Sequence, residues 1–183
     1  MRISDDRYAR DLKRMDLALR LIGHEARTFT IRQWTGLSDD RIRKLYRNYV
    51  ADGAIAGVQR HRGKSPRRVA YFFRSPEVHF QATQLAGLYL IHGLLEGGDG
   101  GVGACYRLGS LDSGGLLVQS YEAYVALHSP ALISFEHAWF LLLALGRQID
   151  IRLRRCPACG ALELCDPYAR NGAGCSGCRQ PTG

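Results

Sequence analysis

The sequence predicts a mainly α-helical protein with a small cysteine-rich module at its C-terminal end. Three observations support this fold class. Apolar residues recur at helical spacing in several segments that glycine, proline or serine separates. Two Cys-x-x-Cys pairs lie near the end of the chain. The chain has 183 residues and 46% hydrophobic content, which is enough for one core and a small satellite module.

Two domains are expected, with a boundary at residue 150. Residues 1–150 are expected to form a helical domain that binds DNA and a protein partner. Residues 151–183 are expected to form a zinc-ribbon-like module with four cysteine ligands. The N-terminal part of the first domain, residues 28–50, resembles a helix-turn-helix motif.

The first fifty residues predict a surface helix and then that motif. Between Asp5 and Gly23, apolar residues at helical spacing predict one buried stripe that ends at a glycine C-cap; they are Tyr8, Leu12, Met15, Leu19 and Ile22. In residues 28–50, Gly36 suits the turn and Ser38 is a suitable N-cap for the second helix. The inward positions of the motif are Ile31, Thr35, Leu37, Ile42 and Leu45.

Three more helices are expected in the middle of the chain. One begins at Pro76, another spans about Ser113 to Leu127, and the last follows the N-cap Ser134. The last helix is apolar nearly all round, which predicts burial in the core or under a partner. Residues 96–103 are expected to form a flexible glycine-rich loop. The apolar stripe of the first of these helices is expected at Phe80, Leu85, Leu88, Ile91 and Leu95.

Four cysteines have the spacing of zinc ligands. Cys156 and Cys159 form one pair, Cys175 and Cys178 form the other, and fifteen residues separate the pairs. Two tight turns at this separation supply the four thiolates of a tetrahedral Zn²⁺ site. Because four thiolates leave no open position for water, the expected cofactor is one structural zinc ion. Two structural disulfides are the alternative.

The other cysteines and the glycines near the pairs have simpler roles. Gly160 and Gly177 are placed to give the left-handed backbone that such turns need. Cys105 and Cys165 lack a Cys-x-x-Cys partner and are expected to be ordinary thiols.

Positive charge is concentrated at the two ends of the chain. Residues 1–75 contain 18 Lys/Arg and 8 Asp/Glu, residues 76–150 contain 2 and 7, and residues 151–183 contain 5 and 2. The net charge of +8 therefore comes from basic ends around an acidic middle, which predicts surfaces for double-stranded DNA. A zinc ion with four thiolates has a formal charge of about −2, so some arginines of the module are expected to offset it.

The candidate DNA-binding residues belong to three regions. These are the second helix of the motif, the basic segment that follows it, and the cysteine module; the residues are Arg41, Arg43, Lys44, Arg47, Arg60, Arg62, Lys64, Arg67, Arg68, Arg170 and Arg179. An ordinary helical hairpin with a solvated charged face remains the alternative for the helix.

The sequence does not predict an enzyme. It contains no paired acid/base set and no nucleophile constellation. The stretch Gly63-Lys64-Ser65 is not a P-loop, because Val58 stands where the first glycine belongs. Gly98, Gly100 and Gly103 fit a dinucleotide-binding fingerprint, but the expected preceding element is a helix.

The expected location is the cytoplasm. The first eleven residues are charged throughout and lack the apolar core of a signal peptide. The longest apolar run, residues 138–146, is too short to span a bilayer, so no membrane association is expected.

Several stretches resemble one known family in their order and spacing. They are Ser120-Tyr121-Glu122-Ala123-Tyr124, Ala138-Trp139, Cys156-Pro157-Ala158-Cys159-Gly160, Cys175-Ser176-Gly177-Cys178 and Gln180-Pro181. This order is similar to that of the bacterial flagellar transcriptional activator FlhC. The stretch Arg41-Ile42-Arg43-Lys44-Leu45-Tyr46 also resembles the Arg-Leu-x-x-Leu-Tyr stretch of that family.

The resemblance covers most of residues 5–181 and is thin between Gln59 and Gly115. It implies a subunit that assembles with an FlhD-like partner, binds promoter DNA upstream of flagellar genes and recruits RNA polymerase. It also implies that the four cysteines of the two pairs bind zinc. The first hypothesis is therefore a zinc-containing DNA-binding transcriptional activator that works in a hetero-oligomer. The alternative is a zinc-ribbon interaction module that contacts RNA polymerase or another assembly without sequence-specific DNA binding.

Overall fold

The computed structural model describes residues 3–51, 57–61, 63–98, 101–148, 150–168, 175 and 178. As predicted, the fold is mainly helical with a cluster of four cysteines near the C-terminus. The chain divides into two compact units. Unit 1 comprises Met1–Ser65 and Arg107–Val118, and unit 2 comprises Pro66–Tyr106 and Gln119–Gly183. The functional boundary predicted at residue 150 stays a prediction.

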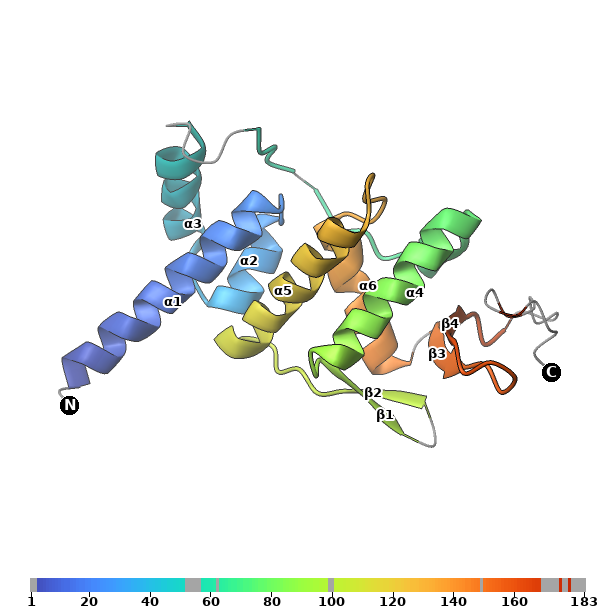
Figure 1. Ribbon diagram of the computed structural model, residues 1–183. Helices are drawn as coiled ribbons and strands as arrows, with labels where there is room; N and C mark the ends of the chain where they lie inside the picture. Colours follow the sequence, from blue (N-terminus) through green and yellow to red (C-terminus); the bar gives the residue numbers. More distant parts are fainter. Residues whose placement is uncertain are drawn as a thin grey trace. The chain divides into compact units, whose positions relative to one another are not determined.

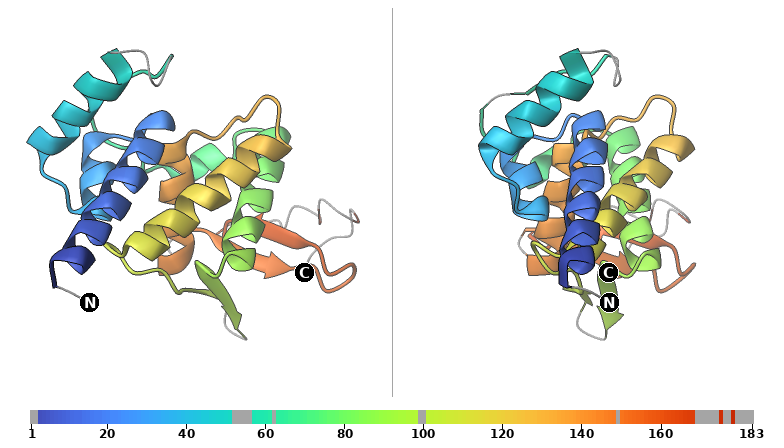
Figure 2. Two further views of the ribbon diagram at one scale, coloured as in Figure 1. Left: turned by 60° about the vertical axis from the view of Figure 1, so that its left-hand side comes forward. Right: turned by 90° about the vertical axis from the view of Figure 1, so that its left-hand side faces the viewer.

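Unit 1 is built on three consecutive helices: α1 (Ile3–Gly23), α2 (Thr28–Thr35) and α3 (Asp39–Leu45). A π-helical turn, η1 (Tyr46–Ala51), continues α3. Helix α2 packs against both α1 and α3, as the views in Figures 1 and 2 show. The predicted inward positions are all buried; they are Ile31, Thr35, Leu37, Ile42 and Leu45. Trp34, which was not in the predicted set, is also fully buried.

The buried face of α1 differs from the predicted stripe. Tyr8 and Leu12 are 68% and 51% exposed. The residues that bury α1 against its neighbours come from its second half: Leu17, Ala18, Leu21 and Ile22. Of the predicted stripe, Ile22 is buried and Met15 and Leu19 are half-buried, so the prediction of one buried stripe along the whole helix was wrong for its first half.

The end of α1 also differs from the prediction of a glycine C-cap. The helix ends at Gly23, but the residue in the left-handed conformation is Glu25, with a φ of 58°. Ala26 N–H donates to Leu21 O and Glu25 N–H to Ile22 O, each at 2.9 Å. This is the hydrogen-bond pattern of a Schellman motif, with a glutamate at the position that glycine usually occupies.

Unit 2 contains the remaining elements. In chain order they are η2 (Val69–Phe73), α4 (Pro76–Ile91), β1 (Leu95–Gly98), β2 (Gly101–Ala104), the second part of α5 (Leu111–Leu127), α6 (Phe135–Arg147), β3 (Arg152–Arg155) and β4 (Leu162–Cys165). The strands form two separate antiparallel hairpins, β1–β2 and β3–β4 (Figure 1). Residues 96–103 were predicted to be a flexible loop, which is wrong for their described part because it belongs to the first hairpin.

The helix that begins at Pro76 is confirmed, but its predicted apolar stripe is only partly right. Leu85 is buried as predicted, whereas Ile91 is 77% exposed, Phe80 is also exposed, and Leu95 is buried in β1 and not in the helix. The buried face of the helix includes Val78, Gln81, Ala82, Leu85, Ala86 and Tyr89. The helix is apolar on more than one face, so periodicity alone did not select the buried one.

Buried hydrogen bonds fix the helices of unit 2 to one another. Gln81 from α4 pairs through its Oε1 with the hydroxyl of Tyr124 and accepts from the N–H of Leu132 at 2.9 Å. The hydroxyl of Tyr89 donates to Ala138 O in α6 at 2.8 Å. Because buried polar groups are stabilising only when they are paired, these contacts specify one arrangement of α4, α5 and α6 within the unit.

The β3–β4 hairpin packs on α4. A β-carbon at Gly87 would lie 3.6 Å from Leu162 Cδ1, and His79 Nε2 lies 2.8 Å from Leu164 O. The buried apolar residues of the hairpin strands are Leu153 and Leu164, whereas Tyr168 is 76% exposed. Helix α4 therefore supplies the apolar surface that supports the cysteine module.

Candidate metal centre and nucleic-acid interface

The first cysteine pair occupies the tip of the β3–β4 hairpin. Arg155 pairs with Leu162 at the end of the ladder, so residues 156–161 form the connecting loop. The N–H of Cys156 donates to Ala161 O and that of Gly160 to Cys156 O, both at 2.8 Å. Gly160 has a φ of 72°, as predicted, which a residue with a β-carbon would adopt only with strain.

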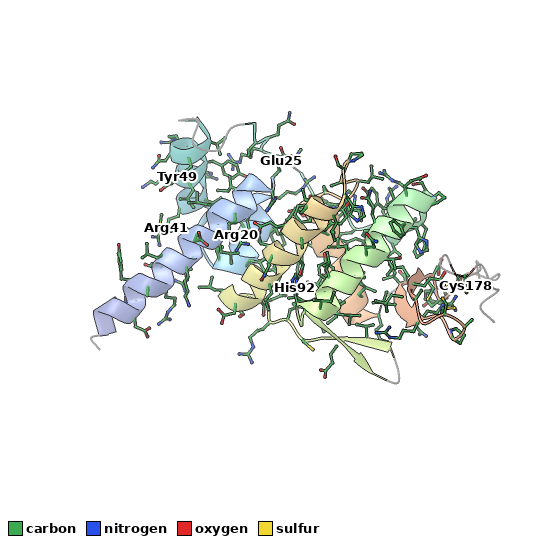
Figure 3. All side chains as sticks on the ribbon, viewed as in Figure 1. Arg20, Glu25, Arg41, Tyr49, His92 and Cys178 are labelled. Atoms are coloured by element: carbon green, nitrogen blue, oxygen red, sulfur yellow. The ribbon has the colours of Figure 1, made fainter. Side chains whose placement is uncertain are left out.

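All four predicted ligands come together in space. The sulfur atoms of Cys156, Cys159, Cys175 and Cys178 lie within 4.8 Å of one another. Cys156 and Cys175 are buried, Cys178 is half-buried and Cys159 is exposed. Cys178 is labelled beside the β3–β4 hairpin in Figure 3. Ser176, Gly177, Arg170 and Arg179 lie outside the described residues.

The sulfur separations fit a tetrahedral metal site and do not fit disulfides. Cys156 Sγ lies 3.7 Å from Cys178 Sγ, and Cys159 Sγ lies 3.6 Å from Cys175 Sγ. A metal–sulfur distance of about 2.3 Å places the corners of a regular tetrahedron about 3.8 Å apart. A disulfide requires sulfurs about 2.05 Å apart. The four cysteines are therefore placed to bind a metal ion such as zinc.

The electrostatics of the cluster also favour a cation. Backbone N–H groups of Cys159 and Ala158 lower the pKa of Cys156 to about 7. The N–H of Ala161 acts in the same direction on Cys159, but the Cys175 sulfur, burial and the other two sulfurs outweigh it and raise that pKa to about 12. Adjacent thiolates repel one another, so a divalent cation between them is what allows all four to be deprotonated.

The other two cysteines are not part of the cluster. The thiol of Cys165 lies 3.6 Å from Arg152 O, and burial raises its pKa. Cys105 is exposed and donates to Glu96 Oε2 at 3.4 Å; its pKa is raised, first by burial and then by that carboxylate. Both pKa shifts disfavour the nucleophilic thiolate, in agreement with the interpretation of both as ordinary thiols.

Two arginines of the module have partners other than the sulfurs. Arg154 Nη2 lies 3.3 Å from Glu163 Oε2, and the Glu163 side chain is only 3% exposed. Arg155 Nη1 donates to Gly160 O at 3.3 Å. Arg154 therefore offsets a buried carboxylate on the opposite strand, and Arg155 ties the strand to the loop that carries the first cysteine pair.

A tight turn between α2 and α3 forms the second candidate site. Gly36 ends α2 with a φ of 68°, and its N–H donates to Arg32 O at 2.9 Å. The hydroxyl of Thr35 donates to Ile31 O and accepts from the N–H of Leu37. Ser38 then caps α3, because its Oγ accepts from the N–H of Arg41 at 3.4 Å. The predicted turn and N-cap are confirmed, and they fix where α3 begins.

Four of the predicted basic residues lie exposed on the helix that this turn positions: Arg41, Arg43, Lys44 and Arg47. Arg43 Nη1 lies 2.8 Å from Asp40 Oδ1, so an acidic neighbour on the same helix partly offsets the charge of Arg43. Within the described part of the chain, no ion pair involves Arg41, Lys44 or Arg47. These three cations are available for an anionic ligand.

A hollow of about 220 Å³ lies beside this basic helix. Helix α1 and the α2–α3 turn contribute apolar residues, and α3 and η1 contribute polar residues and Leu45; the lining residues are Met15, Leu37, Arg41, Lys44, Leu45, Asn48 and Tyr49. Figure 3 labels Arg41 and Tyr49 toward the start and the end of the α3–η1 helix. Sequence reasoning missed Asn48, although its spacing from Arg41 and Lys44, seven and four residues, already places it on the same helical face.

The basic segment after η1 is only partly associated with this helix. Arg60 lies against unit 1, with its guanidinium carbon 5.1 Å from the centre of the Tyr46 ring. Lys64 is exposed and belongs to the same unit, whereas Arg67 and Arg68 are exposed but belong to unit 2. Arg62 lies outside the described residues. The structure thus brings Arg60 together with the α3–η1 helix.

No protein-family model matches the chain, and a search of curated proteins finds no match. Among the described residues, no helix combines the length and the apolar character that a membrane span requires.

Proposed function

We propose that this protein is a zinc-containing, DNA-binding transcriptional regulator. The observation that carries the proposal is the exposed cationic face of α3, held by a capped turn at the second position of a helix-turn-helix arrangement. A second helix of this kind enters the major groove with its basic side chains near phosphates and base edges. Arg41, Lys44 and Arg47 supply the charge, and Asn48 supplies an amide that suits adenine.

The proposed metal is one structural zinc ion. Four thiolates at tetrahedral separations suit zinc better than hard cations such as Mg²⁺ or Ca²⁺, which prefer oxygen ligands. The site has four ligands and leaves no position for a reacting water, so the metal holds the β3–β4 module in shape and performs no chemistry.

The proposed mode of action follows the FlhC resemblance. The chain assembles with an FlhD-like subunit into a hetero-oligomer, binds flagellar promoters in the cytoplasm and contacts RNA polymerase. The exposed Tyr8 and Leu12, four residues apart on α1, support a protein partner, because together they present an apolar stripe outside the core of unit 1. Co-expression with a candidate partner, followed by size measurement, tests this part of the proposal.

The salt dependence of binding to duplex DNA tests the proposed function. The zinc-loaded chain, with its partner if it requires one, is titrated with a fluorescent duplex at several salt concentrations. Contact with six or more phosphates gives a log–log slope steeper than about −5. A chain without affinity for duplex DNA, or with a nearly flat salt response, would favour the protein-interaction module instead.

A further inference from the structure

Glu25 occupies a backbone position that glutamate rarely takes. Its φ of 58° is in the left-handed region, at the residue of a Schellman motif where glycine is preferred. A residue with a β-carbon in this region costs on the order of 1 kcal/mol, and such positions are often retained for function. The side chain of Glu25 is therefore the feature to account for.

The carboxylate of Glu25 holds the segment that follows η1. Its Oε1 accepts a hydrogen bond from the backbone N–H of Gln59 at 2.9 Å, and its Oε2 lies 2.7 Å from His61 Nε2. The Gln59 N–H is the main reason that the pKa of Glu25 is lowered, and His61 adds to the effect. Figure 3 shows Glu25 at the end of α1, beside this segment. One side chain thus holds residues on both sides of Arg60.

Arg60 lies in a defined place because of this anchor. Its Nη2 donates to Thr28 Oγ1 at 3.3 Å, and its guanidinium carbon lies 5.1 Å from the centre of the Tyr46 ring. Tyr46 is itself buried, and its hydroxyl donates to Ala26 O at 3.1 Å. Further along the segment, Gly63 lies close to the connection between α1 and α2, since a β-carbon at Gly63 would lie 3.6 Å from Arg27 Nη1.

The location of Arg60 relates it to the basic face of the α3–η1 helix. Tyr46 immediately precedes Arg47 and follows Arg43 by three residues, so its ring lies on the flank of that face. A guanidinium over this ring places a further cation beside the helix that carries Arg43 and Arg47. The anchored segment therefore widens the cationic surface beyond the helix itself.

We infer that Glu25 is a positioning residue for DNA binding, which holds residues 59–61 so that Arg60 contacts a phosphate of the duplex that the α3–η1 helix binds. The inference rests on the proposed function. It predicts a change in DNA affinity opposite to the one that charge alone predicts. An exposed carboxylate near bound DNA repels phosphate, so its removal should strengthen binding. If Glu25 positions Arg60, its removal weakens binding instead.

The test uses the full-length, zinc-loaded chain and its Glu25→Gly, Arg60→Ala and doubly substituted variants. Glycine adopts the left-handed conformation without strain, so Glu25→Gly keeps or improves the folding of the α1–α2 corner. Affinity for a random-sequence duplex is measured over a salt series. Arg60→Ala is expected to weaken binding roughly fivefold and to reduce the salt slope by about one unit. Glu25→Gly is expected to cause a loss of similar size, and the double variant no further loss.

Hydrogen exchange at the Gln59 amide gives a readout that does not depend on DNA. Its N–H is expected to be protected in the wild type and unprotected in Glu25→Gly. Asp6→Ala, which removes an exposed carboxylate elsewhere on α1, serves as the charge control and should leave Gln59 protected and binding unchanged or slightly tighter.

The outcomes separate the two claims. If the wild type binds DNA but Glu25→Gly binds as tightly or more tightly, or if its effect adds to that of Arg60→Ala, the positioning role is wrong and the proposed function stands. An unprotected Gln59 amide in the wild type also overturns the positioning role. If the wild type does not bind duplex DNA at all, the proposed function fails and the role of Glu25 in it fails as well, while the exchange data still decide whether the anchor exists.

Discussion

The four sulfur atoms of the cluster lie close to one another, whereas the other described thiols, Cys105 and Cys165, lie outside the cluster. Neither of these two thiols is therefore placed to replace a cysteine of the cluster as a ligand. Cys156→Ser or Cys175→Ser removes one of two buried ligands. Either change is expected to abolish stoichiometric zinc binding and to unfold the β3–β4 module, because a metal of this kind contributes on the order of 10 kcal/mol to the folding of a small module. Zinc content by elemental analysis and hydrogen exchange of the β3 and β4 amides measure the two effects.

Cys165→Ser is the matched control for this prediction. Cys165 lies on β4 but outside the cluster, so the variant should retain one zinc per chain and a protected hairpin. A Cys156→Ser variant that still binds zinc one-to-one would contradict the assignment of the ligands.

The lowered pKa of Glu25 makes unit 1 sensitive to acid. A carboxylate whose pKa is lower in the folded protein than its usual value of about 4.5 stabilises the fold above that value, and this stabilisation is lost as pH falls through the folded pKa. The wild type should therefore lose stability relative to Glu25→Gln as pH falls from neutral through the usual pKa of about 4.5 and below it. Urea titrations of both proteins across this range measure the difference, and a difference that stays constant with pH would contradict it.

For single residues, the sequence predicts the metal ligands better than it predicts a side chain such as Glu25, which holds a distant segment in place. The four cysteines could be recognised because the geometry of a zinc site fixes both residue type and spacing. The role of Glu25 could not be recognised, because it depends on a left-handed residue and on partners 34 and 36 positions away. Asn48 is intermediate: its spacing was available, but the hollow that it lines exists only in the folded chain.

The N-cap Ser38 fixes the start of α3, the helix that is proposed to bind DNA. Ser38→Ala removes the hydroxyl that accepts from Arg41 N–H and is expected to cost about 1 kcal/mol of stability. Because Arg41 is itself on the basic face, DNA affinity should fall as well. Thermal or urea unfolding and a DNA titration measure the two effects.

Ser134→Ala provides a comparison at the N-cap of α6 in unit 2, where the hydroxyl accepts from His137 N–H. It should cost a similar amount of stability and leave DNA affinity unchanged. Equal losses of DNA affinity in the two variants would show that the effect of Ser38→Ala is only a general loss of stability.

Helices and caps were predictable, and the faces that they bury were less so. Ser38 and Ser134 are N-caps as predicted, and each accepts a local hydrogen bond from a backbone N–H. Ser75 caps α4 in the same way but was not predicted. The stripe of α4 was misassigned because the helix is apolar on several faces, and only packing against its neighbours selects one. The β1–β2 hairpin was missed because glycine-rich strands lack the alternation of apolar and polar residues that identifies a strand.

For the whole molecule, the distribution of charge gives more information than the net charge of +8. Of the basic candidates, those on α3 and Arg60 belong to unit 1, and Arg67 and Arg68 belong to unit 2. The cysteine cluster is also in unit 2. The proposed function therefore assigns DNA binding first to the α3–η1 helix of unit 1, and a structural role to the metal in unit 2.

The central claim is that the α3–η1 helix binds the phosphate backbone, and the salt dependence of one triple variant tests it most directly. The Arg41→Ala/Lys44→Ala/Arg47→Ala variant is compared with the wild type and with Arg107→Ala, a control at an exposed arginine outside this helix in the same unit. Each lost phosphate contact reduces the log–log slope by about 0.9. The triple variant should therefore have a slope shallower by about 2.7 and the control an unchanged slope. Equal slopes for the triple variant and the wild type would contradict the account.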